Sequence, residues 1–290
     1  MSEKTFYIVD VFAETKYSGN QLAVFRNAAG LSTDEMQTIA REMHFSETTF
    51  ILSDAPRAGG YDVRIFTPGS EVPFAGHPTL GTAYVIQREI IGEPAERVTL
   101  NLKVGPIRVT VREDILWMRQ NEPEFDGGLG ASVVAKVLGL EGDEIDRRFP
   151  VQQVSTGLPH IIVPLVGMEA LRRIKVAADR YWQLVEDTWA KAILVFCPGG
   201  YDERHDLGVR MFADYYGVPE DPATGSGNGC LAAYLVKHCY FGKDSIDIRT
   251  GQGFEIGRPS LLYLRAERKE GCIDVQVGGR VVKVAEGVFV

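Results

Sequence analysis

The fold is decided by a stretch that occurs twice in the chain, at residues 71–77 (EVPFAGH) and at residues 220–226 (EDPATGS). The glutamate, proline and glycine at positions 71, 73 and 76 recur 149 positions later, at 220, 222 and 225. Each copy follows a Val-Arg-x-Phe segment, at 63–66 and at 209–212. A repeat at about half of the 290-residue length indicates a duplicated supersecondary unit.

A helix is predicted after each glycine turn. The residues that follow His77 and Ser226 are apolar or small on all sides, so each helix must be enclosed by protein. A further helix is predicted up to Met43, because Ser32 and Glu35 have the spacing of a capping box. Alternating or apolar segments predict strands at 6–12, 48–52, 61–66, 98–104, 107–111 and 115–118, and then at 151–154, 160–165, 192–196, 245–249, 261–264 and 273–277.

These patterns predict an α/β (α+β) fold with two pseudo-symmetric domains, each a mixed β-sheet rolled around a central buried helix. The length agrees, since it is about twice a domain of roughly 150 residues. We expect the first domain at 1–120 and the second at 121–278, with 279–290 a candidate to pack back on the first. Two such units facing each other would form a cleft, where we expect the chemistry.

Composition and charge limit the partners. The chain has 31 Lys and Arg against 39 Asp and Glu, and the net charge of -8 opposes binding to nucleic acid or anionic lipid. No apolar run reaches the ~20 residues of a membrane helix. The N-terminus lacks the apolar core and cleavage site of a signal peptide, which predicts a cytoplasmic protein.

The spacing of potential ligands argues against a metal or nucleotide. The cysteines form no C-x-x-C pair and the histidines no H-E-x-x-H motif, so we expect no metal and four buried free thiols. Residues 225–229 (GSGNG) could suggest a phosphate loop. No Lys-Ser/Thr pair follows them, and no acidic residue ends the next strand of a Rossmann unit. We therefore expect no cofactor.

The two glycine turns and nearby polar residues are the candidates for chemistry. Helix N-termini at Gly76 and Gly225 suit a carboxylate or a developing oxyanion, although the glycines could also serve only a tight turn. Glu47 lies where a helix ends and an apolar strand begins, so poor hydration would suit a proton-transferring base. A solvated glutamate is the alternative. His77 and Asp221 could orient a substrate, relay a proton, or satisfy local backbone groups.

Several segments together resemble one known family. They are 19–25 (GNQLAVF), 41–50 (REMHFSETTF), 64–68 (RIFTP), 71–81 (EVPFAGHPTLG), 220–227 (EDPATGSG), 252–253 (QG) and 257–260 (GRPS). As a set they resemble the phenazine-biosynthesis PhzF-like family, whose fold is shared with diaminopimelate epimerase. The resemblance extends over essentially the whole chain.

The resemblance implies a cofactor-independent isomerase that is usually a homodimer and that takes part in biosynthesis of phenazine-like metabolites. Glu47 matches the residue that moves a proton between carbons of a small cyclic amino acid, trans-2,3-dihydro-3-hydroxyanthranilate. By the same resemblance, His77, Asp221 and Ser226 would hold the polar groups of the substrate and assist the transfer. The remaining substrate contacts that it implies are Asn20, Ser46, Gly76, Gly225 and Gly227.

Four positions distinguish this chain from related patterns. The epimerases place a cysteine before each glycine, where this chain has Ala75 and Thr224, so a two-thiol racemase is excluded. His44 stands where the PhzF-like family often has Asn, and Gly227 where it often has Ala. The departures at His44 and Gly227 leave the reaction class intact and the particular substrate open. The alternatives are a proton-transfer isomerase acting on a different small carboxylic acid, and a catalytically silent ligand-binding homologue.

Overall fold

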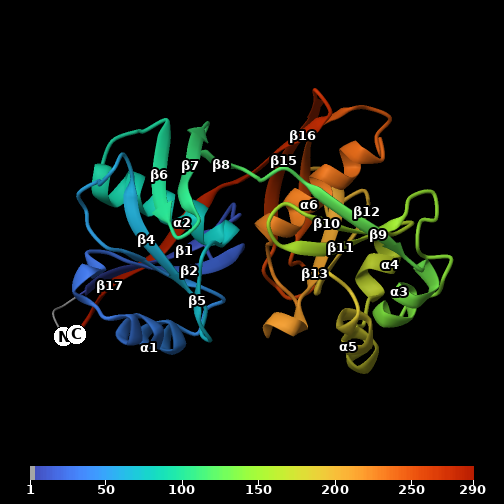
Figure 1. Ribbon diagram of the computed structural model, residues 1–290, viewed down its shortest axis with the longest axis horizontal. Coiled ribbons are helices and arrows are strands. Elements are labelled where there is room, and N and C mark those ends of the chain that lie inside the picture. Colours follow the sequence, from blue (N-terminus) through green and yellow to red (C-terminus); the bar gives the residue numbers. More distant parts are fainter. Residues whose placement is uncertain (1–3) are drawn as a thin grey trace. The chain divides into compact units, whose positions relative to one another are not determined.

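The computed structural model describes residues 4–290 as two compact units (Figure 1). The first unit contains the described residues up to Met118 together with Gly278–Val290, and the second contains Arg119–Val277. Residues 1–3 of the predicted first domain lie outside the described residues.

The first unit is a mixed sheet wrapped around helix α2 (Gly76–Val85). Paired strands follow the order β17-β1-β2-β3-β4-β6-β7-β8. The pairs β2–β3 and β4–β6 are parallel and the others antiparallel. Helix α2 contacts β1, β2, β3, β6, β7 and β17. The elements are β1 (Lys4–Val11), β2 (Asn20–Phe25), η1 (Ala28–Gly30), α1 (Thr33–Met43), β3 (Thr48–Ile51), β4 (Tyr61–Phe66), β5 (Glu71–Val72), η2 (Ile86–Ile91), β6 (Arg97–Leu102), β7 (Gly105–Arg112), β8 (Ile115–Arg119) and β17 (Val281–Phe289).

The second unit is a mixed sheet that contacts α6 (Gly225–Lys237) through β10, β11, β12, β14 and β15. Its paired strands follow the order β9-β10-β11-β12-β13-β14-β15, with β11–β12 and β13–β14 parallel. The elements are β9 (Glu124–Leu129), α3 (Ala131–Leu138), β10 (Val151–Ser155), β11 (Pro159–Pro164), α4 (Met168–Arg173), α5 (Ala178–Glu186), β12 (Ala192–Pro198), β13 (Leu207–Phe212), η3 (Asp214–Tyr216), β14 (Ser245–Gln252), β15 (Ser260–Lys269) and β16 (Cys272–Gly279).

The two units pair their strands in the same order and sense. Reading from β17 in the first unit and from β9 in the second, seven strands are joined antiparallel, antiparallel, parallel, antiparallel, parallel and antiparallel. In both units the glycine turn and its buried helix follow the fifth strand of this series, β4 or β13. The predicted fold class, a mixed sheet around a central helix in each half, is confirmed.

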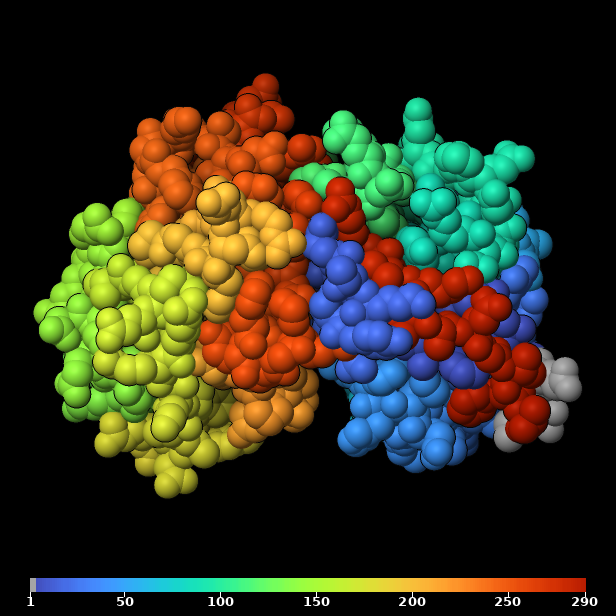
Figure 2. Space-filling view, turned by 180° about the vertical axis from the view of Figure 1, so that it is seen from behind, coloured from blue at the N-terminus to red at the C-terminus, as the bar shows by residue number. Residues whose placement is uncertain are grey.

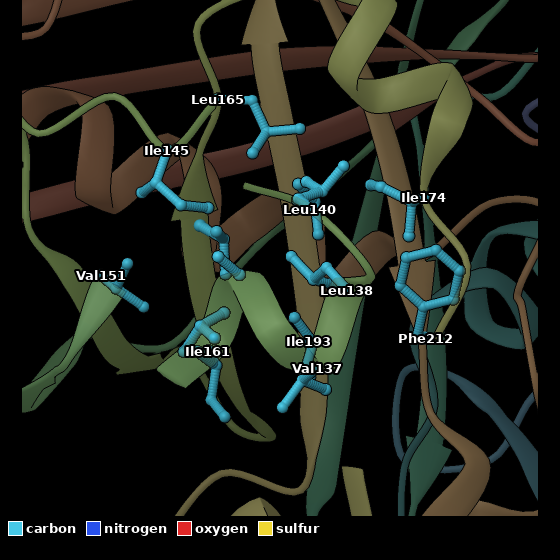
Figure 3. Close-up of a cluster of buried hydrophobic side chains, with 14 of the residues drawn as sticks. Val137, Leu138, Leu140, Ile145, Val151, Ile161, Leu165, Ile174, Ile193 and Phe212 are labelled. Atoms are coloured by element: carbon cyan, nitrogen blue, oxygen red, sulfur yellow. The ribbon is translucent and has the colours of Figure 1, made fainter. Parts of the chain in front are cut away.

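Close packing holds each central helix against its sheet. A Cβ atom at Gly81 of α2 would lie only 2.6 Å from Leu22 Cδ2 and 2.8 Å from Val11 Cγ2. In the second unit, helices α3, α4 and α5 supply apolar side chains to a separate buried cluster with the sheet (Figure 3). That cluster includes Val137, Leu138, Ile161, Ile193 and Phe212.

Several features differ from the sequence prediction or add to it. Helices α3, α4 and α5 and strands β9 and β17 were not predicted. Strand β17 pairs antiparallel with β1, so the C-terminal residues lie against the N-terminal segment (Figure 2). The prediction of four buried thiols is wrong for Cys239 and Cys272, which are both exposed, Cys239 in a turn and Cys272 at the start of β16. Within residues 4–290, no helix is long and apolar enough to cross a membrane.

Candidate active site

Glu47 and His77 lie together in the first unit. Glu47 immediately precedes β3, and His77 is the second residue of α2. A hydrogen bond of 2.8 Å between the buried hydroxyls of Thr49 and Thr82 joins this strand to this helix. The result is a distance of 3.6 Å between Glu47 Oε2 and His77 Nε2, with side-chain exposures of 19% and 7%. Glu47 and His77, which are 30 positions apart in the chain, therefore form one cluster.

The His77 imidazole is neutral and its tautomer follows from its neighbours. Burial lowers the pKa of His77 to about 4, and the hydrogen bond to the backbone of Gln21 only partly opposes that shift. Nε2 lies 3.3 Å from Gln21 O and faces Glu47 Oε2, and because a carbonyl can only accept, Nε2 carries the hydrogen. His77 thus lies beside the Glu47 carboxylate without adding a positive charge, which would make that carboxylate a weaker base.

The start of α2 provides donors beside this pair. Its N-cap is Ala75, which has no side chain able to cap, and the first intrahelical bond runs from Thr79 N to Ala75 O. The amides of Gly76 and His77 precede that bond, while Pro78 has no N–H to contribute. An uncapped, partly exposed helix start of this kind favours a negatively charged group.

In the second unit, a buried polar network fixes the start of α6. The Asp221 carboxylate accepts a hydrogen bond from the Thr224 hydroxyl. The Gln252 amide nitrogen donates to Asp221 O at 2.8 Å and to Thr224 Oγ1 at 3.0 Å. The Gln252 amide oxygen accepts from Thr224 N at 3.3 Å and from Asn228 Nδ2 at 2.8 Å. Gln252 therefore uses both its donors and both its acceptor positions to hold the residues that precede Gly225.

Backbone packing reinforces this arrangement. Gly253 has a φ of +78°, and a Cβ atom there would lie 2.5 Å from Pro222 O and 2.4 Å from Arg258 O. Only glycine allows the strand end to approach the loop so closely. The position of Thr224, the N-cap of α6, is thus determined by contacts from β14 and from the residues directly after it.

The other predicted site residues lie as follows. Asn20 is buried at the start of β2, and Ser46 is partly buried just before Glu47. Ser226 is partly exposed at the second position of α6, and Gly227 follows it, fully enclosed. A Cβ atom at Gly227 would lie 2.8 Å from Leu194 Cδ1 and 3.2 Å from His160 Nε2. His44, a departure from the family pattern, is exposed and ends α1 in the left-handed conformation, with φ 54°.

The hydrogen-bond network around Gln252 was not predicted from the sequence. Gln252 belongs to a segment shared with the family, but its partners Asp221, Thr224 and Asn228 are 24 to 31 positions away in the chain. The sequence offers a signal only in that the segment 252–253 is part of the resemblance. Among the described residues, no group of three or more His, Cys, Asp or Glu side chains could hold a metal ion.

The chain matches the family model described as phenazine biosynthesis-like protein over residues 9–287. It is 37% identical to a trans-2,3-dihydro-3-hydroxyanthranilate isomerase of Pseudomonas chlororaphis, covering 98% of this chain and 99% of the relative. It is 35% identical to an isomerase of the same name from Pseudomonas aeruginosa, covering 97% and 98%.

A solved structure has the same fold along the whole chain. The phenazine biosynthesis protein of the PhzF family from Bacillus anthracis superposes with a TM-score of 0.90 at 28% identity, covering 100% of both chains. A probable proline racemase from Agrobacterium radiobacter, at 12% identity and a TM-score of 0.61, shares the fold alone. With a family model and full-length relatives in agreement, the chain belongs to the phenazine biosynthesis-like, or PhzF, family.

Proposed function

We propose that this protein is an isomerase that needs no cofactor and moves a proton between carbons of a small cyclic amino acid. The Pseudomonas relatives named for trans-2,3-dihydro-3-hydroxyanthranilate make that acid the first candidate substrate, in a pathway to phenazine-like metabolites. The observation that carries the proposal is the Glu47 carboxylate, mostly buried and 3.6 Å from the Nε2–H of a neutral His77. A carboxylate in such surroundings suits proton transfer to and from carbon.

In the proposed reaction Glu47 acts twice. A C–H bond of the substrate breaks and its proton passes to a Glu47 oxygen, while the electron pair moves along the diene. The same proton is then delivered to the carbon at the far end, so that substrate and product have the same composition. His77, whose Nε2 lies 3.6 Å from Glu47 Oε2, is proposed to assist the transfer as a neutral neighbour of the carboxylate. Asp221 and Ser226 are proposed to hold the substrate's polar groups.

The carboxylate of the substrate is proposed to bind the amides that begin α2 and α6, around Gly76 and Gly225. Neither helix has a side-chain cap. A favourable contact between an anion and a helix start contributes roughly 0.3–1 kcal/mol, and up to ~2 kcal/mol where it is partly buried. Asn20, Ser46 and Gly227 are proposed to complete the contacts.

We also propose that the protein is cytoplasmic. By its resemblance to the family, it is further proposed to form a homodimer. Sedimentation equilibrium checks the second point. The expected result is a mass of twice 32.0 kDa, and a single species of 32.0 kDa would contradict it.

The function is tested by incubating the protein in D₂O with trans-2,3-dihydro-3-hydroxyanthranilate and with a panel of other small cyclic acids and amino acids. Nuclear magnetic resonance then follows exchange and migration of carbon-bound hydrogen. We expect isomerisation of the dihydro acid. Exchange in a different member of the panel alone would keep the reaction class and change the substrate. No exchange in any of them would favour a ligand-binding homologue.

A further inference from the structure

We propose that two matching ion pairs, Arg64–Glu71 and Arg210–Glu220, are positioning residues that set the two glycine turns of this enzyme. The inference rests on the proposed function, because it assigns the helix starts a part in that reaction. Each pair joins a sheet strand to the glutamate that opens the repeated stretch.

In the first unit the contact is bidentate. Arg64 Nε and Nη2 donate to the two oxygens of Glu71, both at 2.8 Å. The guanidinium also lies 5.0 Å from the centre of the Phe66 ring, and it donates to Thr33 Oγ1 at the start of α1. Glu71 accepts a further hydrogen bond from Lys103 at 2.7 Å, and hydrogen bonding to Arg64 lowers the pKa of its carboxyl to about 2.

The second unit repeats the contact. Arg210 Nε and Nη2 donate to the two oxygens of Glu220, at 2.8 and 2.7 Å. The Arg210 guanidinium lies 5.0 Å from the centre of the Phe212 ring, as Arg64 does over Phe66. Arg210 is buried and also donates to Leu171 O at 3.1 Å. Glu220 directly precedes Asp221, whose own backbone N–H bonds to Met211 O.

The two ion pairs differ in the spacing from arginine to glutamate and agree in the spacing from glutamate to the helix glycine. Arginine and glutamate are 7 positions apart in the first unit and 10 in the second, so the connecting loop differs in length. The glutamate nevertheless precedes the helix glycine by the same interval, from 71 to 76 and from 220 to 225. In both units the ion pair therefore fixes the chain at the same position, five residues before the helix glycine, although the loop between arginine and glutamate differs in length.

Stability alone does not account for two such pairs. Arg210 is 8% exposed at its side chain, and burying a charged pair costs about as much as its attraction returns. A planar guanidinium that binds both oxygens of a carboxylate does, however, fix its direction. Gly76 and Gly225, the first residues of α2 and α6, follow the paired glutamates by five positions. A fixed glutamate is therefore expected to fix the positions of the helix-start amides, and with them those of His77 and Asp221.

The test replaces each arginine with lysine, which keeps the charge and loses the planar fork. Arg64→Lys and Arg210→Lys are expected to lower kcat by roughly tenfold or more, since small displacements of positioned groups can cost up to about a hundredfold. KM is expected to change less, by about threefold at most, because the groups that bind substrate remain present.

Two other Arg–Asp pairs provide controls. In the first unit, Arg26 shares its one Nε–H between the two oxygens of Asp54, at 2.9 and 3.0 Å. In the second unit, Arg148 donates from Nε and Nη2 to both oxygens of Asp146, at 2.9 and 2.7 Å. Arg26→Lys and Arg148→Lys are expected to leave kcat within about twofold. If Arg64→Lys and Arg210→Lys lose no more kcat than these controls, the proposal is wrong. Should Arg210→Lys not fold, Glu220→Gln, which keeps the side chain's shape, takes its place with the same expectation.

Hydrogen exchange separates this proposal from the proposed function. The first intrahelical bonds are donated by Thr79 N in α2 and Asn228 N in α6. Amide exchange at Thr79 is expected to be about tenfold faster in Arg64→Lys, and at Asn228 in Arg210→Lys, with no such change in the controls. This readout needs no substrate, so a wild-type protein that fails to isomerise the acid would overturn the function alone. Unchanged exchange rates at both amides would overturn the positioning role.

Discussion

At the scale of single residues, burial determines what His77 contributes. A histidine with a pKa of about 4 stays neutral at neutral pH, so its Nε2–H can donate to Gln21 O, 3.3 Å away, and the ring supplies no counter-charge to Glu47. His160 in the second unit has the same property for the same cause: burial lowers its pKa to about 4. Its Nδ1–H donates to Leu158 O at 2.8 Å.

Both histidines make stability depend on pH. Their pKa values are lower in the folded chain, about 4 against 6.5. Between these values the unfolded chain binds more protons, so the free energy of unfolding falls as pH drops from about 6.5 to about 4. Each histidine is expected to contribute about 1–3 kcal/mol to that loss. Urea denaturation at pH 7 and pH 4.5 measures it.

Substitutions identify the source of this pH dependence. His160→Leu and His77→Leu each remove one titrating group, so each variant is expected to lose less stability between pH 7 and pH 4.5 than the wild type does. A loss of the same size in both variants and in the wild type would show that other groups account for it.

At this scale the sequence could suggest residues but not their contacts. Glu47 and His77 stood out from local context and from the resemblance, yet they are 30 positions apart and meet only because β3 packs on α2. Gln252 has no local signal, since its four hydrogen bonds all go to residues distant in the chain. Long-range contacts of this kind depend on the fold.

At the scale of elements, the first turn of α6 packs closely against β11 and β12 at Gly227. Gly227 faces Leu194 and His160 at distances that leave no room for a methyl group. Gly227→Ala is expected to destabilise the protein by about 1–3 kcal/mol, as overpacking of a core does. Chemical denaturation measures the loss.

A second substitution checks the cause. Leu194→Val removes the carbon nearest to the new methyl group, so the double variant with Gly227→Ala is expected to recover part of the lost stability. Strictly additive losses in the double variant would mean that the two side chains do not compete for the same space.

Elements with a start signal were predictable and those without one were not. Helix α1 has its capping box, with Glu35 N bonded to Ser32 Oγ at 3.2 Å and Ser32 N to Glu35 Oε2 at 2.7 Å, and α2 and α6 follow glycine turns. In contrast, α3, α4 and α5 begin after Gly130, Gly167 and Ala177, none of which has a side chain that can cap. Local sequence therefore gave no indication of where they start.

At the scale of the whole molecule, duplication explains most of what the sequence could predict. The repeated stretch placed a buried helix in each half, and the strand pairing has the same order in both units. The final strand was not predicted because its residues are only partly buried and its partner β1 lies at the opposite end of the chain.

Strand β17 is expected to matter for the stability of the first unit. Phe289 makes edge-to-face contacts with Phe6 and Phe25, at 5.5 and 5.2 Å between ring centres. Phe289→Ala is expected to cost about 1–3 kcal/mol, less than a fully buried phenylalanine. The neighbouring Val288 is 51% exposed, so Val288→Ala is expected to change stability by less than about 0.5 kcal/mol. Equal losses in the two variants, measured by thermal unfolding, would contradict this account of β17.

The central claim is that Glu47 carries the proton in both steps of an isomerisation. The most direct measurement compares the turnover of trans-2,3-dihydro-3-hydroxyanthranilate by the wild type, by Glu47→Gln and by a control, Glu42→Gln, which changes an exposed glutamate of α1. Glutamine keeps the size and the hydrogen-bonding reach of Glu47 but cannot accept a proton from carbon. We predict that Glu47→Gln folds as the wild type does and loses at least about 10²–10⁴-fold in kcat, while the control keeps wild-type activity. A Glu47→Gln variant that retains more than about a tenth of wild-type turnover would contradict the claim.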